Sequence, residues 1–182
     1  FHQTGDILFE GSQGLLIDRN YGIRPNTTLL DTTNHNGIKL ANQLNTNIHK
    51  IGAITPFTSR HGIGILPTFD KNINDKIYDE NQSQTFFQGK PRYGWFDLVL
   101  AKYSKSINEY DELFMTQIDR LSNFKIIKLC ICYRYYGIID DEFERTFDYE
   151  IQDNDVIIKS IKQNSLYLKK YLSNCSPVYI DN

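Results

Sequence analysis

The sequence lacks the features that mark membrane-bound, secreted and nucleic-acid-binding proteins. No apolar run approaches the roughly 18 residues that a membrane-spanning helix needs, and the amino terminus does not resemble a signal peptide. Charge of one sign is not in excess, because 20 lysines and arginines stand against 22 aspartates and glutamates. We therefore expect a cytoplasmic chain that binds neither membrane nor nucleic acid.

Cysteine is scarce, and its pattern argues against a metal site. The three cysteines are Cys130, Cys132 and Cys175, and the first two alternate within an apolar run. An odd number in this pattern favours buried or half-buried thiols in a reducing compartment. A metal pair is the weaker alternative, because Cys-x-Cys lacks the usual two-residue spacer.

The common phosphate-binding loop is absent too. No G-x-x-x-x-G-K-[ST] motif occurs in the 182 residues. The chain opens on Phe1 and not on methionine, so we expect further residues upstream of it. What is present is an ordinary globular composition, 40% hydrophobic and 23% charged, which fits a single domain over residues 1–182.

A stretch near the amino terminus gives the first indication of a ligand site. Ile7–Phe9 predicts a short strand buried on both faces, and Glu10–Gly14 predicts a turn at its carboxyl end. In an open α/β sheet that edge is where ligands bind. Gln13, between two glycines, offers the donor and the acceptor that a purine edge requires. A strand ending in a plain glycine turn is the alternative.

The remaining elements follow from periodicity and turn residues. Helices are predicted at 36–48, at 94–107 with Trp95 as a core anchor, and at 155–173 as one helix or two. Strands are predicted at 50–58, broken near Pro56, at 113–119, at 125–136 with a second run at 138–143, and at 175–180. Residues 72–88 are polar and nearly aperiodic, which predicts a flexible loop.

Several polar residues allow both a functional and a structural interpretation. Arg60 lies beside Gly62 and Gly64, which keep the loop open to a ligand, whereas a surface arginine in such a place is commonly just solvated. The acidic run Asp140–Glu142 suggests a metal site, but a solvated turn is favoured. His35 and His49 flank a predicted helix, where solvated helix ends explain them. These residues alone do not define a function.

The opening segment as a whole resembles one family. Its matching positions are Phe9–Gly14, Leu16, Asp18, Gly22, Pro25, Thr28 and Thr32–Thr33, and they are similar to the FEGAQG…LD…G…P…T…NTT segment of adenylosuccinate synthetase. That enzyme joins IMP to aspartate using GTP. Further along, Ser59–Thr68 is similar to the family's TRVGxGPFPTE loop, Gly89–Asp97 to its TTGRPRRxGWFD segment, and 125–143 to its LKICVAYRYKGEVIDEFP hairpin.

The resemblance implies a role for particular residues. It assigns Gln13, Thr28 and Arg60 to IMP, Lys90 and Arg92 to aspartate, and Gln117 and Asp119 to GTP. Asp119 matches a carboxylate that accepts hydrogen bonds from the guanine N1–H and amine, while a helix or turn cap remains the alternative. Mg²⁺ is the implied cofactor. We expect its ligands and all catalytic residues to lie outside this chain.

The sequence also departs from the family pattern. Phe86–Phe87 replace paired threonines, Lys90 replaces an arginine, and one residue is missing between Arg92 and Gly94. A lysine does not reproduce the bidentate fork of a guanidinium group. The family's guanine-wrapping segment is also absent, because the chain ends at Asp181–Asn182.

The resemblance covers nearly all of 1–182 and implies the carboxy-terminal half of an adenylosuccinate synthetase-like protein. The implied fold is α/β, with a mixed, largely parallel central sheet and flanking helices, related to the P-loop NTPases. The implied function is GTP-dependent ligation of IMP and aspartate in AMP biosynthesis, by a homodimer or together with the missing amino-terminal half. The alternative is a non-catalytic relative that binds nucleotide or serves as a structural subunit of a larger assembly.

Overall fold

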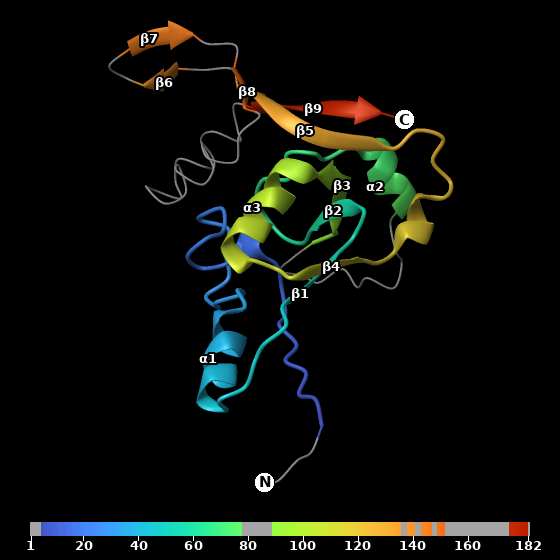
Figure 1. Cartoon of the computed structure of the whole chain (residues 1–182). Coiled ribbons are helices and arrows are strands. Elements are labelled where there is room, and N and C mark those ends of the chain that lie inside the picture. Colours follow the sequence, from blue (N-terminus) through green and yellow to red (C-terminus); the bar gives the residue numbers. More distant parts are fainter. Residues whose placement is uncertain are drawn as a thin grey trace.

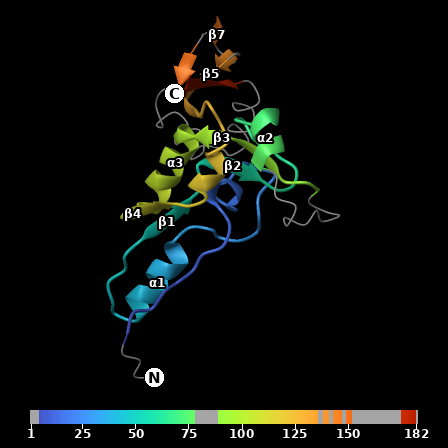
Figure 2. The same cartoon turned by 90° about the vertical axis from the view of Figure 1, so that its right-hand side faces the viewer.

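The computed structural model describes residues 5–77, 89–135, 138–140, 143–146, 149–151 and 175–181. Figure 1 shows strands β5 and β9 along one side of the molecule, with helix α3 beneath them and helix α1 at the far end. Figure 2 shows the same separation from the side, with β1 and β4 between α1 and the main sheet. No helix in the described ranges is long and apolar enough to cross a membrane.

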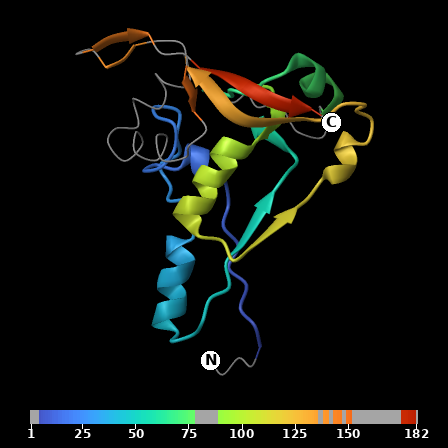
Figure 3. The ribbon, with the colours of Figure 1, turned by 45° about the horizontal axis from the view of Figure 1, so that its top comes forward.

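The strands form one larger sheet and two small ones. The larger sheet runs β2 (Phe57–Arg60), β3 (Arg92–Asp97), β5 (Lys128–Tyr135) and β8 (Tyr149–Ile151), with β9 (Cys175–Asp181) also paired to β5. The small sheets are β1 (Ile51–Ile54) with β4 (Glu112–Met115), and β6 (Ile138–Asp140) with β7 (Phe143–Thr146). In Figure 3, β5 and β9 lie side by side, as do β1 and β4.

The predicted mixed α/β class is confirmed, but the prediction that the central sheet is largely parallel is wrong, because β3–β5 is the one parallel pair among the described strands of the larger sheet. The β3–β5 and β1–β4 pairs are parallel, whereas β2–β3, β5–β8, β5–β9 and β6–β7 are antiparallel. The strands predicted at 50–58, 113–119, 125–136 and 175–180 correspond to β1 with β2, β4, β5 and β9. The predicted hairpin of β5 with the run after it is wrong in its pairing, because β6 pairs with β7.

The predicted buried strand Ile7–Phe9 is wrong. These residues form no strand, and the exposed fractions of Ile7, Leu8 and Phe9 are 58%, 88% and 40%. A strand needs a neighbour to accept and donate its backbone hydrogen bonds, and in the described ranges no strand pairs with this segment. Three apolar residues in a row predicted a buried strand, but in the described chain these three side chains are exposed.

The first predicted helix, at 36–48, is present but ends earlier than predicted, and the second, at 94–107, begins later. Helix α1 spans His35–Gln43, and α3 spans Leu98–Asn108. Residues 94–97 belong to β3, because Trp95 donates its amide to Thr68 O (3.0 Å) and Gly94 bridges Phe69. A Cβ atom at Gly94 would lie 2.8 Å from the Phe69 nitrogen, so this close backbone contact requires a glycine.

The polar segment predicted as a loop at 72–88 is a helix in its first part. Helix α2 spans Lys71–Ile77 and buries Ile73 and Ile77, which lie four residues apart on one face. The many polar side chains around them concealed this spacing. The rest of that prediction, at 78–88, lies outside the described residues, as does the helix predicted at 155–173.

Two clusters of buried side chains pack against the larger sheet. One joins the 3₁₀ helix η1 (Leu15–Ile17) and α3 to β5 through Leu15, Ile23, Val99, Tyr103, Cys130 and Tyr133. The other joins α2 and the 3₁₀ helix η2 (Ile118–Leu121) to β2 and β3 through Phe57, Ile73, Ile77, Tyr93, Trp95 and Leu121. Trp95 is confirmed as a core anchor, and the thiols of Cys130 and Cys132 are buried, as the sequence predicts.

A buried carboxyl group begins α3. Asp97 is the N-cap, and its Oδ1 accepts a hydrogen bond from the Leu100 amide (3.0 Å), while Oδ2 accepts one from the Tyr133 hydroxyl. Burial outweighs these hydrogen bonds and raises the pKa of Asp97 from 3.8 to about 6. The buried group therefore takes up a proton more readily than it does in the unfolded chain.

This pKa shift predicts that Asp97 makes the fold less stable as pH rises. Its contribution to the free energy of unfolding is fully present below the unfolded pKa of 3.8 and is lost as pH rises through the folded pKa of about 6. The loss amounts to about 3 kcal/mol. Urea denaturation between pH 4 and pH 7 measures it as the difference between wild type and Asp97→Asn. A difference that stays constant with pH contradicts the assignment.

Candidate functional site

Two arginines face each other across the β2–β3 pair. Arg60 and Arg92 are direct register partners on these antiparallel strands, so their side chains lie on the same face of the sheet. Arg60 Nη2 donates to Ile63 O (3.1 Å) and to Asn26 O (2.8 Å). Arg92 Nη2 donates to Gly62 O (2.8 Å) and to Gly64 O (2.7 Å). Both guanidinium groups therefore lie against the loop that follows β2.

The glycines of this loop allow the close approach. Gly64 has a φ of +130°, and a Cβ atom there would lie 2.6 Å from the guanidinium carbon of Arg60. A side chain at this position is therefore excluded both by the backbone conformation and by the space that Arg60 occupies. The sequence predicted that glycines keep this loop open, and the structure shows that Gly64 makes room for Arg60.

The two arginines have no acidic partner in the described ranges. Their hydrogen bonds go to main-chain carbonyl groups, and neither forms an ion pair there. Only 8% of Arg60 is exposed, and burial, together with the charge of Arg92, lowers the pKa of Arg60 below its ordinary value. Two adjacent cations without a counter-ion favour an anionic ligand, such as a phosphate or a carboxylate.

The segments that carry Gln13 and Thr28 are held together by backbone contacts. The Thr28 amide donates to Ile17 O (2.7 Å), and Thr32 Oγ1 donates to Gly14 O (3.2 Å), next to Gln13. Gln13 itself has a φ of 70°, an uncommon conformation for a residue other than glycine. Arg60 contacts the same region through Asn26 O, so the structure brings the three residues predicted for IMP into one neighbourhood.

Lys90 lies just before the strand that carries Arg92. It is exposed and follows Gly89, whose φ is +65°, two residues before Arg92 at the start of β3. Of the two residues predicted for aspartate, Lys90 lies just before β3 and Arg92 is the first residue of that strand. This position is next to the loop that both arginines hold.

Gln117 and Asp119 lie at a different place, after the end of β4. Gln117 has a left-handed backbone (φ 59°) and caps η2, and Asp119 is exposed in the first turn of that helix. The Asp119 carboxylate accepts no hydrogen bond from the described residues, whereas its main-chain oxygen accepts from the Ser122 amide (3.1 Å) and hydroxyl (2.7 Å). The capping contact is thus made by the backbone, and the carboxylate faces solvent.

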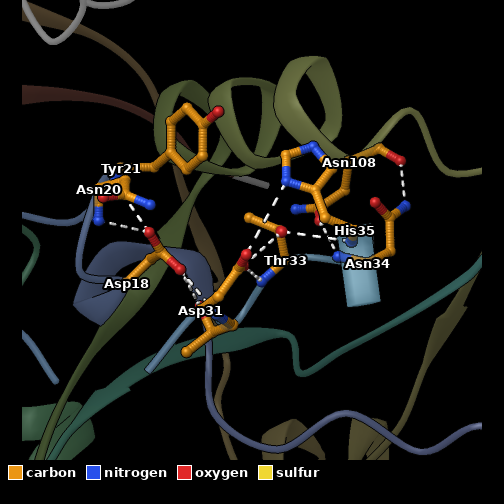
Figure 4. A network of polar contacts seen from close by, with 9 residues as sticks. Asp18, Asn20, Tyr21, Asp31, Thr33, Asn34, His35 and Asn108 are labelled. Atoms are coloured by element: carbon orange, nitrogen blue, oxygen red, sulfur yellow. Dashed lines mark hydrogen bonds and ion pairs between the residues drawn. The ribbon is translucent and has the colours of Figure 1, made fainter. Parts of the chain in front are cut away.

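The sequence motifs predict no separate role for Asp18. Its side chain is buried and accepts hydrogen bonds from the amides of Asn20 (2.6 Å), Tyr21 (2.9 Å) and Thr32 (2.6 Å). Figure 4 shows this carboxylate beside a second set of polar contacts, which extends to Asn108 of α3. The sequence does not reveal these contacts for two reasons. An aspartate after an apolar run is a common pattern, and the Thr32 donor lies 14 residues away.

Taken together, the fold and this site define an α/β protein with a pair of arginines beside a glycine loop, and among the described residues these arginines have no acidic partner. Residues 1–167 match the family model of adenylosuccinate synthetase. The chain therefore belongs to the adenylosuccinate synthetase family, which confirms the resemblance seen in its motifs.

Individual relatives agree with this assignment. The chain is 31% identical to the adenylosuccinate synthetase of Desulforamulus reducens over 97% of its own length, which is 37% of that protein. With the synthetase of Borrelia turicatae it shares 33% identity over 91% of its length and 40% of the relative. The chain thus spans about two fifths of the curated relatives that it matches.

A solved structure is similar in fold. The fully ligated adenylosuccinate synthetase from Plasmodium falciparum superposes with a TM-score of 0.69 at 20% identity. The match covers 94% of this chain and 37% of that one. It establishes the fold, since identity at this level does not carry a function over.

Proposed function

We propose that this chain supplies the IMP- and aspartate-binding part of an adenylosuccinate synthetase-like ligase of AMP biosynthesis. The observation that carries the proposal is the pairing of Arg60 with Arg92 across β2–β3. Arg60 is proposed for IMP and Arg92 for aspartate. A reaction that joins two anionic substrates needs both of them bound side by side, and facing guanidinium groups provide such a place.

The proposed reaction has two steps. The γ-phosphoryl group of GTP is transferred to the hypoxanthine oxygen of IMP, GDP leaves, and the purine N1 proton passes to a base outside this chain. The aspartate amine then forms a bond to the ring carbon that bears this oxygen, losing a proton to solvent, as the C–O bond breaks and phosphate leaves. In this proposal Gln13 contacts the purine edge and the Thr28 hydroxyl lies near the IMP phosphate. Lys90 and Arg92 orient the aspartate carboxylates, and Gln117 and Asp119 bind the guanine of GTP. Mg²⁺, when bound by residues outside this chain, neutralises the GTP phosphates.

An exposed apolar surface supports a role in a larger assembly. All four residues of β4 are exposed, and apolar side chains on β4 and on its neighbour β1 are open to solvent; these are Ile51, Leu113, Phe114 and Met115. Parallel strands are normally buried on both faces. We propose that a further polypeptide, corresponding to the part of the relatives outside this chain or to a second copy, covers this surface.

The alternative function is a non-catalytic relative that binds nucleotide or forms part of an assembly. It is favoured by the altered aspartate segment, in which Lys90 and Phe86–Phe87 replace the family's residues. A lysine holds a dicarboxylate less specifically than an arginine, since it lacks the planar pair of donors. IMP binding without aspartate binding would distinguish this alternative from the first.

Titration of the full chain with IMP tests the proposed site. We expect Arg60→Gln to weaken IMP binding by about 10-fold or more, because a charged hydrogen-bond donor is lost. Chemical-shift changes in ¹⁵N spectra measure the affinity, and circular dichroism checks that each variant is folded. Arg120→Gln is the control, since Arg120 is half-buried and, like Arg60, donates to a carbonyl group, Ile77 O (3.4 Å). Equal weakening in both variants contradicts the assignment.

A further inference from the structure

We infer that Asp18 is a positioning residue that holds the Gln13 turn and the Thr28 segment in their nucleotide-binding arrangement. The inference rests on the proposed function and goes beyond it, because it concerns a residue that does not touch the ligand. Asp18 has an exposed fraction of 0%, so it acts only through the groups that surround it.

The two carboxylate oxygens of Asp18 have different partners. Oδ1 accepts hydrogen bonds from the nearby amides of Asn20 (2.6 Å) and Tyr21 (2.9 Å), which fixes the turn after η1. Oδ2 accepts from the Thr32 amide (2.6 Å) and the Thr32 hydroxyl (3.3 Å), which lie 14 residues along the chain. One carboxylate therefore joins a local turn to a distant segment.

Backbone contacts on either side of Asp18 continue this connection. Ile17 O accepts from the Thr28 amide (2.7 Å), and the Arg19 amide donates to Leu30 O (3.2 Å). The Thr32 hydroxyl has one proton, which it shares between Asp18 Oδ2 (3.3 Å) and Gly14 O (3.2 Å), next to Gln13. The positions of Gln13 and Thr28 relative to each other thus depend on contacts that converge on Asp18.

In the described part of the chain, hydrogen bonds and not a cation stabilise the charge of Asp18. Burial alone raises the pKa of a carboxyl group, yet the hydrogen bonds from Thr32, Asn20 and Tyr21 together lower the pKa of Asp18 below 3.8. Donors directed at both oxygens require an ionised carboxylate, since an amide or a protonated acid accepts fully on one side only. The site is therefore built for an aspartate and not for a neutral isostere.

The segment that Asp18 holds is itself fixed to α3. Asn34 donates its amide to Asn108 Oδ1 (3.1 Å) and its side chain to Asn108 O (2.5 Å), and Tyr21 O accepts from the Tyr103 hydroxyl (2.9 Å). Figure 4 shows the Asn34–Asn108 contacts beside those of Asp18. With both ends attached to α3, release of Oδ2 would free the middle, where Thr28 lies.

The substitution Asp18→Asn tests the inference with little change in shape. Its oxygen can still accept from Asn20 and Tyr21, while its amide nitrogen would face the Thr32 amide, a donor opposite a donor. Asp70→Asn is the matched control. Asp70 also joins a local amide, Asn72 (2.8 Å), to a distant donor, Trp95 Nε1 (2.8 Å), but it lies just before α2 and its hydrogen bonds do not involve the Thr28 segment.

Two measurements on the full chain decide the outcome. We expect Asp18→Asn to speed amide hydrogen exchange at Thr28 and Thr32 and to weaken IMP binding by about 10-fold, with Asp70→Asn within about twofold of wild type. Unchanged exchange at Thr28 and Thr32, or equal loss of IMP affinity in both variants, overturns the inference. If wild type and Asp18→Asn bind IMP equally well, the inference about Asp18 is refuted and the proposed function is not. If wild type binds no IMP, the proposed function is refuted and, with it, the role of Asp18 in binding.

Discussion

Replacement of Trp95 by alanine lowers the free energy of unfolding by about 3–5 kcal/mol, the range for truncating a buried tryptophan. Only 2% of Trp95 is exposed. Its ring packs edge-on against Phe124, with centroids 5.4 Å apart, and its Nε1 donates to Asp70 Oδ2 (2.8 Å). The substitution thus leaves a cavity between α2 and the sheet and removes the donor for a carboxylate.

Chemical denaturation monitored by circular dichroism measures this loss. Phe69→Ala is the control, because Phe69 is also aromatic and lies close by, but 47% of it is exposed. We expect that change to cost less than about 1 kcal/mol. A Trp95→Ala variant as stable as Phe69→Ala would show that this cluster is not the core of the fold.

The second large effect concerns turnover. We expect the purified chain, given IMP, aspartate, GTP and Mg²⁺, to form no adenylosuccinate. Its 182 residues contain no common phosphate loop, and we expect the catalytic residues to lie outside them. The aspartate segment is also one residue short, and catalysis is sensitive to misplacements of about 1 Å.

A coupled assay with the Desulforamulus reducens synthetase as positive control measures this prediction. The relative establishes that the conditions support the reaction, and heat-treated chain gives the background rate. Product formed by the chain above that background would reveal a catalytic group within these residues. It would also refute the proposal that catalysis depends on a further polypeptide.

The sequence predicted contacts well where a local pattern determined them. Trp95 was expected in the core and is buried, although its neighbours at helical spacing led to a helix in place of the end of β3. The ladder with β2 and the contact of Gly94 with Phe69 decided the strand, and both join residues far apart in the sequence. Periodicity does not contain that information.

The candidate site shows the same limit. The motifs indicated Arg60 and Arg92 separately, but only the register of β2 against β3 shows that they face each other. No local pattern indicates the contacts of Asp18, because one of its carboxylate oxygens accepts a hydrogen bond from Thr32, 14 positions away. Ile7–Phe9 was expected to be buried because an apolar run does not reveal whether a partner strand is present.

The most direct test of the proposed function is a structure of the full chain with IMP and aspartate bound. We expect both ligands on the face of the β2–β3 pair that carries the arginines, with IMP contacting Arg60 and an aspartate carboxylate contacting Arg92. Gln13 and Thr28 should line the same IMP pocket. Ligands bound on another face, or IMP in contact with neither arginine, would contradict the proposed function.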